Sequence, residues 1–214
     1  MKRRELLAFG LTALAAGAAP WPALAQAQPE PQSQPIDVEG ILNDPRVPTG
    51  GNPKGDVTIV AFLDYNCPYC KTSAPDLARI VKEDGKIRVV YKDWPILTEA
   101  SVYGAQMALA AKYQGKYDAV HHALMAIPGR RIPQEQMLEA IKGAGVDMAR
   151  LDADLQAHGP EIVAVLKANL AQADSLGLRG TPTYLVGPLL ASTLDYASFK
   201  RIVAEARRRQ AEEQ

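Results

Sequence analysis

The stretch Val57–Lys71 reads VTIVAFLDYNCPYCK. It opens with Val57–Asp64, a nearly continuous apolar run rich in β-branched side chains, which is typical of a strand buried on both faces. The spacing of apolar residues over Pro68–Asp84 then predicts a helix, with a proline suited to its first position and Gly85 placed to cap its end. Two cysteines therefore stand where a buried strand gives way to a helix.

The motif at this junction is Cys67-Pro68-Tyr69-Cys70. The unpaired N–H groups of a helix's first turn carry the positive end of the helix dipole, so they favour a thiolate over a thiol. Cysteines placed this way have depressed pKa values, from about 7 down to about 3.5 in known oxidoreductases. We therefore expect Cys67 to be an exposed nucleophile and Cys70, one turn further in, to be a more buried resolving thiol.

Other uses of a cysteine pair fit this sequence less well. A structural disulfide would close so short a loop that it would constrain the unfolded chain very little. Zinc needs three or four ligands, and His121, His122 and His158 are not at ligand spacing near the pair. Covalent haem attachment requires a histidine directly after the second cysteine, where this chain has Lys71. We expect no metal, and a redox dithiol is the favoured interpretation.

Further strands and helices follow along the chain. Ile87–Tyr91 predicts a second strand, and strand–helix–strand order implies a parallel pair. Thr183–Val186 predicts a short strand, and Tyr196–Arg209 predicts a last amphipathic helix. Between the second and third strands the pattern predicts only helices, over residues 98–113, 116–127, 134–143, 147–157 and 161–176.

This order indicates an α/β fold interrupted by an all-helical insertion. The α/β part falls into two pieces, residues 57–97 and 178–214, and the helical insertion is residues 98–177. Residues 26–56 precede it as a lead-in, and their first ten residues are so rich in proline and glutamine that we expect a flexible tether.

Residues 1–25 have the three parts of a bacterial signal peptide. The basic region, the apolar stretch and the A-x-A cleavage site are Lys2-Arg3-Arg4, Leu6–Ala19 and Ala23-Leu24-Ala25. The apolar stretch is too short for a helix to span a bilayer core of roughly 30 Å, which argues against a membrane anchor. We expect export to the periplasm, where disulfides form and persist, with the Sec and twin-arginine routes both open.

Composition limits the possible partners. The 214 residues contain 24 basic and 24 acidic side chains, a net charge of zero that argues against nucleic-acid binding. Only two cysteines are present, which excludes a scaffold held by several disulfides.

Three stretches together resemble the DsbA-like thiol-disulfide oxidoreductases: Val57–Lys71, VVYKDWP at Val89–Pro95 and GTPT at Gly180–Thr183. These are thioredoxin-fold proteins of the bacterial cell envelope with an inserted helical domain, and the resemblance covers nearly all of residues 37–210. It implies a thioredoxin-like fold with an inserted all-helical subdomain. It also implies that the first cysteine attacks and the second resolves, and that a cis-proline helps to bind the substrate chain. The substrate-binding residues expected on this basis are Pro68, Tyr69, Thr181 and Pro182.

Two positions depart from the family pattern. A buried acid that shuttles protons usually lies six residues before the first cysteine, where this chain has Ala61. Asp64 lies closer, but strand alternation places it on the opposite face, so we expect protons to move through water or another group. The loop expected after the last strand, where a Pro-Gly turn is common, reads Ala191-Ser192-Thr193.

The resemblance implies an oxidase that donates disulfides to cysteine-containing exported proteins and is reoxidised by a membrane redox partner. The Cys67–Cys70 disulfide would be its only redox centre, with no added cofactor. The segment before the first strand is too short and too rich in proline to form an oligomerisation segment, which favours a monomer. A reductase or isomerase stays open as an alternative, as does a chaperone that binds metal through the two thiolates.

Overall fold

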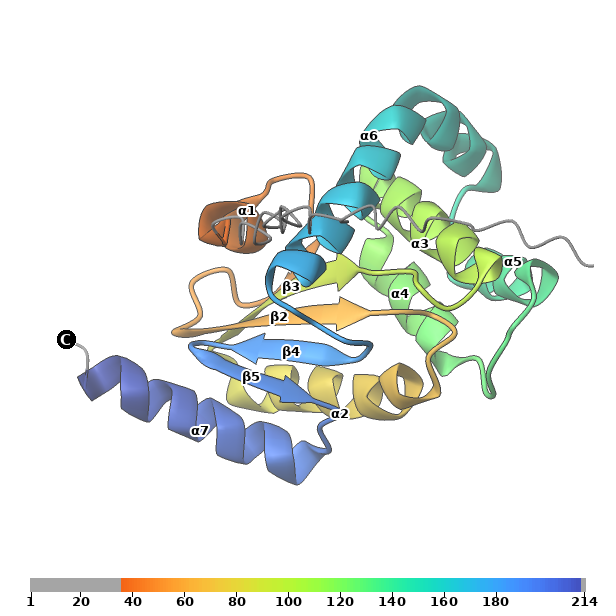
Figure 1. The fold of residues 1–214 in the computed structure, drawn as a ribbon. Helices are drawn as coiled ribbons and strands as arrows, with labels where there is room; N and C mark the ends of the chain where they lie inside the picture. The colour runs from red at the N-terminus through yellow and green to blue at the C-terminus, as the bar shows by residue number, and fades with distance from the viewer. Residues whose placement is uncertain (1–35, 213–214) are drawn as a thin grey trace, which may run out of the picture. The chain divides into compact units, whose positions relative to one another are not determined.

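The computed structural model describes residues 36–212, so the predicted signal peptide and residues 26–35 of the tether lie outside the described part (Figure 1). The described residues contain a five-stranded sheet in the order β1-β3-β2-β4-β5. Its strands are β1 Thr49–Gly51, β2 Val57–Leu63, β3 Ile87–Asp93, β4 Thr183–Val186 and β5 Leu189–Ser192. β2 and β3 are parallel, as the sequence predicts, and the other three pairings are antiparallel.

Helices cover both faces of this sheet. α2 and α7 pack on one face, while α1 and α6 lie across the other (Figure 1). α3, α4 and α5 gather beyond the carboxyl ends of β2 and β3 (Figure 1). The helices are α1 Val38–Asn43, α2 Pro68–Asp84, α3 Glu99–Ala111, α4 Tyr117–Ala126, α5 Gln134–Gly143, α6 Met148–Ser175 and α7 Tyr196–Glu212, with a 3₁₀ turn at Lys112–Gln114. Among the described residues, no helix combines the length and the apolar character needed to cross a membrane.

The central strand and the helix after it match the prediction. Every residue of β2 except Thr58 is buried, because helices cover the sheet on both sides. α2 begins at Pro68, whose missing N–H costs nothing at the first helical position. It ends at Gly85, which adopts a left-handed φ of 69° that favours glycine.

The predicted break between helices 147–157 and 161–176 is wrong. α6 continues as one helix of 28 residues with Pro160 inside it. A proline cannot donate the usual backbone hydrogen bond, so the local pattern favours a break there. The residues on either side of the proline are packed, however, with Leu151 and Ile162 both buried, and this tertiary contact holds the two halves in one helix.

Three short elements were not predicted. α1 and β1 lie within the segment interpreted as a lead-in, and β1 pairs with β3 although two of its three residues are glycines. β5 occupies part of the expected loop, so Ala191 and Ser192 lie in a strand rather than in a turn. The chain reverses instead at Gly187 and Pro188, where the glycine has a positive φ of 52°.

Candidate active site

Cys67 is the N-cap residue of α2, at the end of the sheet where β2 runs out. Its Sγ accepts a hydrogen bond from the Cys70 backbone N–H at 3.4 Å, which satisfies one of the helix's unpaired donors. Both cysteines are free thiols in this structure. The predicted pair therefore sits on the first turn of α2, with the first sulfur at the positive end of the helix dipole.

The segment before β4 faces this sulfur. The Cys67 thiol donates a hydrogen bond to the Thr181 carbonyl at 3.1 Å, across 114 positions of the chain. The peptide bond between Thr181 and Pro182 is cis, as the resemblance implies. The structure therefore brings the two sequence motifs together, and it places Pro68 and Tyr69 in the exposed first turn of α2.

The expectation that Cys67 is exposed is wrong. Its side chain is only 3% exposed, because the Thr181 segment lies against it, and Cys70 is fully buried at 0%. The predicted order of burial does hold. Of the expected site residues, Pro68 and Tyr69 are exposed, Tyr69 at 62%.

The two thiols have opposite acidities. A hydrogen bond from the Cys70 thiol, together with donors at Thr181 and in the first turn of α2, lowers the pKa of Cys67 to about 6. Burial raises the pKa of Cys70, and the neighbouring Cys67 adds to this effect. At neutral pH the outer sulfur is therefore a thiolate and the inner sulfur a thiol, as the sequence predicts.

Asp64 organises the loop that carries Cys67. Its buried carboxylate accepts hydrogen bonds from the backbone N–H of Asn66 at 2.7 Å, from Ile96 and Leu97 at 2.8 and 3.0 Å, and from the Ser101 hydroxyl at 2.7 Å. These bonds tie the active-site loop to the loop between β3 and α3. The sequence did not indicate this role, because every distant partner of Asp64 comes from a segment more than thirty positions away.

A buried polar cluster lies behind the loop and was also missed. Tyr65, next to Asp64, shares a hydrogen bond of 3.1 Å with His121 Nδ1, and the Tyr117 hydroxyl donates to Asp93 at 3.1 Å. Burial raises the pKa of Asp93 to about 7 and lowers that of His121 to about 3. His121 is therefore a neutral core residue.

Within residues 36–212, no group of three or more His, Cys, Asp or Glu side chains is placed to hold a metal ion. The chemistry that the geometry allows is thiol–disulfide exchange: an acidic outer thiol, a buried partner thiol one turn along the same helix, and a carbonyl facing the reacting sulfur.

Solved structures similar to this chain are thioredoxin-like oxidoreductases and thiol-disulfide exchange proteins. A thioredoxin-like oxidoreductase from Silicibacter pomeroyi DSS-3 is 39% identical, with a TM-score of 0.74 over 80% of this chain and 98% of that one. The thiol-disulfide exchange protein alpha-DsbA2 from Wolbachia pipientis is 30% identical, with a TM-score of 0.72 over 78% of this chain and 90% of that one.

The curated relatives that match this region include two different kinds of protein. The probable disulfide bond formation protein D of Bacillus anthracis is 25% identical over 72% of this chain and 75% of its own length. The Na(+)/H(+) antiporter NhaA 1 of Salinispora arenicola is 30% identical over 71% of this chain, but the match spans only 23% of the antiporter's length. This chain thus corresponds to about a quarter of that relative.

The thioredoxin family matches residues 44–205, which include both cysteines and the cis-proline. The protein belongs to this family and, within it, to the DsbA-like thiol-disulfide oxidoreductases, whose thioredoxin-like fold carries an inserted set of helices. The resemblance in sequence is thereby confirmed.

Proposed function

We propose that the protein donates disulfides to cysteine-containing exported proteins in the bacterial periplasm. The observation that carries this proposal is the acidity of Cys67, whose pKa of about 6 makes it a thiolate at neutral pH. A stabilised thiolate favours the reduced form of the pair, so the oxidised form readily accepts electrons. The disulfide exchange protein and the disulfide bond formation protein among the relatives support the same activity.

The reaction proceeds in two exchanges. A substrate thiolate attacks Cys67 Sγ of the oxidised pair, which forms a mixed disulfide and releases Cys70, whose sulfur takes up a proton. The substrate's second thiolate then attacks the substrate's first cysteine sulfur in the mixed disulfide, which forms the substrate disulfide and releases Cys67 as a thiolate. Two electrons pass from the substrate to the pair, and a membrane redox partner takes them to restore the Cys67–Cys70 disulfide. No other cofactor is needed.

Site roles follow from this sequence of steps. The Cys67 sulfur is the atom that exchanges, and Cys70 is the resolving thiol. The surface that receives the substrate is formed by Thr181, Pro182, Pro68 and Tyr69. The predicted signal peptide supports a periplasmic location, and the proline-rich lead-in supports a monomer.

The reduction potential of the pair tests the direction of electron flow. Equilibration of the purified protein with glutathione buffers should give a value above about −200 mV, toward the roughly −120 mV of a strong oxidant. A value at or below about −200 mV would instead favour a reductase or isomerase kept reduced by its membrane partner.

Replacement of the inner cysteine separates an oxidoreductase from a metal-binding chaperone. Cys70→Ser should trap mixed disulfides through Cys67 with thiol-bearing proteins of the periplasm, because the resolving thiol is absent. Cys67→Ser, the matched control, should trap none. If Cys70→Ser forms no mixed disulfide and the wild type binds copper or zinc through both thiolates, the chaperone takes the place of the oxidoreductase.

A further inference from the structure

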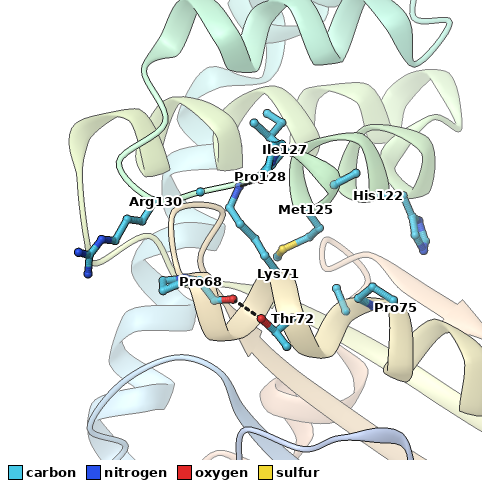
Figure 2. A pocket seen from close by; sticks show the side chains of 12 residues that line it. Pro68, Lys71, Thr72, Pro75, His122, Met125, Ile127, Pro128 and Arg130 are labelled. Carbon is cyan, nitrogen blue, oxygen red and sulfur yellow. Dashed lines mark hydrogen bonds between the residues drawn. The ribbon is translucent and has the colours of Figure 1, made fainter.

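A cavity of about 870 Å³ opens beside the first turn of α2. One wall is the face of α2 that carries Pro68, Lys71, Thr72 and Pro75, and the other is the end of α4 with the segment that follows it, residues 125–130 (Figure 2). We name it the α2–α4 cavity. Because Pro68 directly follows Cys67, a chain whose cysteine has reached that sulfur lies at the mouth of this cavity.

The interior of the α2–α4 cavity offers apolar surface. The Lys71 side chain crosses it, but its Nζ is bound to the carbonyls of Leu124 and Ile127 at 3.3 and 2.7 Å (Figure 2). The Thr72 hydroxyl donates to the Pro68 carbonyl at 3.0 Å. With these polar groups already paired, the surface left for a ligand comes from side chains such as Met125, a flexible residue that adapts to different apolar partners.

The rim of the cavity is basic. No aspartate or glutamate is among the lining residues, whereas His122 and Arg130 are. His122 has Asp118 at 3.3 Å, so its charge is partly balanced when it is protonated. Arg130 is exposed, forms no ion pair within the described residues, and extends outward at the Pro68 end (Figure 2). The unbalanced charge at the mouth is therefore positive.

A second cavity beside the cis-proline has the same sign of charge. It is lined by residues 177–183 and 190–193, among which Arg179 is the charged residue and no carboxylate occurs. A polypeptide that approaches Cys67 along either cavity therefore passes a cation, and no carboxylate lines either cavity. This charge pattern favours acidic ligands.

We propose that the α2–α4 cavity binds the segment next to the reacting cysteine of the substrate protein and selects segments that combine apolar and acidic side chains. Apolar side chains enter between α2 and α4, and a carboxylate pairs with Arg130 at the mouth. From Pro68 to Pro75 the wall is about 10 Å long, the length of about three extended residues. This inference rests on the proposed function and names the substrate class for it.

Peptides test the charge preference directly. We would measure the rate constant with which the oxidised protein oxidises short peptides that carry two cysteines. The peptides differ only at the positions two and three residues before or after the first cysteine. These positions carry Glu, Gln or Lys. On at least one side, Glu peptides should react about two- to fivefold faster than Lys peptides at low salt, with the difference shrinking as salt is added.

Two matched variants show where the preference arises. Arg130→Glu should abolish or reverse the Glu-to-Lys rate ratio. Arg131→Glu, the neighbouring exposed arginine that does not line the cavity, makes the same change in net charge and should leave the ratio near the wild-type value. Comparing ratios between variants removes differences in the peptides' own reactivity. An unchanged ratio in Arg130→Glu, or equal effects of both variants, would overturn the proposal.

A large side chain introduced into the α2–α4 cavity tests whether apolar side chains of the substrate enter it. Ala126→Trp places a large ring at an exposed position in the lining, and Ala157→Trp makes the same change on α6 outside it. Only the first should slow peptide oxidation several-fold, and neither should alter the reaction with dithiothreitol. If dithiothreitol reacts but the peptides show no dependence on charge or on the cavity, this inference fails alone. If dithiothreitol does not react either, the proposed function fails with it.

Discussion

At the scale of single residues, the hydroxyl of Thr181 is poised to act on the reacting sulfur. Its oxygen is buried and has no hydrogen-bond partner within the described residues while Cys67 is a protonated thiol. The hydroxyl proton is thus free to be donated, and the Thr181 side chain is one of the groups that lower the pKa of Cys67. The same residue therefore accepts a hydrogen bond from the Cys67 thiol through its carbonyl and lowers the pKa of that thiol through its side chain.

Thr181→Val should raise the pKa of Cys67 from about 6 by about one unit, because a hydrogen bond to a charged group is lost while the shape is kept. The ultraviolet absorbance of the thiolate as a function of pH measures this value. Thr181→Ser keeps the hydroxyl and should stay close to the wild type. A Thr181→Val titration that coincides with the wild type would show that the first turn of α2 alone sets the acidity.

The residues of the site differ in how far the sequence could predict them. Cys67 and Cys70 follow from their place between an apolar strand and an amphipathic helix, a local pattern. Thr181 and Pro182 follow only from the resemblance to a family. The partners of Asp64 and the cluster around Asp93 could not be predicted, because they depend on contacts between segments that are distant in the chain.

At the scale of elements, local rules predict the structure where packing agrees with them. In α2, the proline at the start, the glycine at the end and the apolar face all indicate the same helix. In α6, Pro160 favours a break in the helix, whereas the packing on both sides of it favours one continuous helix. The continuous helix is what forms. β1 and β5, of three and four residues, are too short for periodicity to reveal and exist through pairing with their neighbours.

The proline inside α6 gives a direct test of this conflict. Pro160→Ala should raise the free energy of unfolding by about 1–3 kcal/mol, because alanine restores a backbone donor and suits a helix interior. Urea unfolding measures the change. Pro133→Ala, at the N-cap of α5 where no backbone bond is at stake, is the matched control and should change stability by less. A less stable Pro160→Ala protein would mean that the packing of α6 requires the proline's distortion.

At the scale of the whole molecule, the buried cluster behind the active site couples folding to pH. Asp93 is 2% exposed and its pKa is raised by burial from 3.8 to about 7, so the folded protein keeps this proton where the unfolded chain has released it. Between these values the folded state binds more protons than the unfolded state. This group therefore lowers the free energy of unfolding as the pH rises from about 4 to about 7.

His121 acts in the opposite direction over part of the same range. Its pKa is lowered by burial from 6.5 to about 3, so the unfolded chain takes up a proton that the folded protein does not. This group therefore raises the free energy of unfolding as the pH rises toward 6.5. Because the two effects oppose each other, the pH dependence of the wild type alone does not reveal either, and a variant that removes one of them is needed.

Asp93→Asn supplies that variant. The amide is neutral at every pH and can still accept the hydrogen bond from Tyr117, so only the cost of keeping a proton on Asp93 is removed. Relative to the wild type, its free energy of unfolding should gain about 2–3 kcal/mol between about pH 5 and about pH 8, measured by urea unfolding at each pH. Asp152→Asn, at an exposed position on α6, should show a much smaller difference between the two pH values. If Asp93→Asn follows the wild type in parallel from one pH to the other, the carboxyl is ionised in the folded protein, and Tyr65 and Tyr117 hold a buried charge behind the active site.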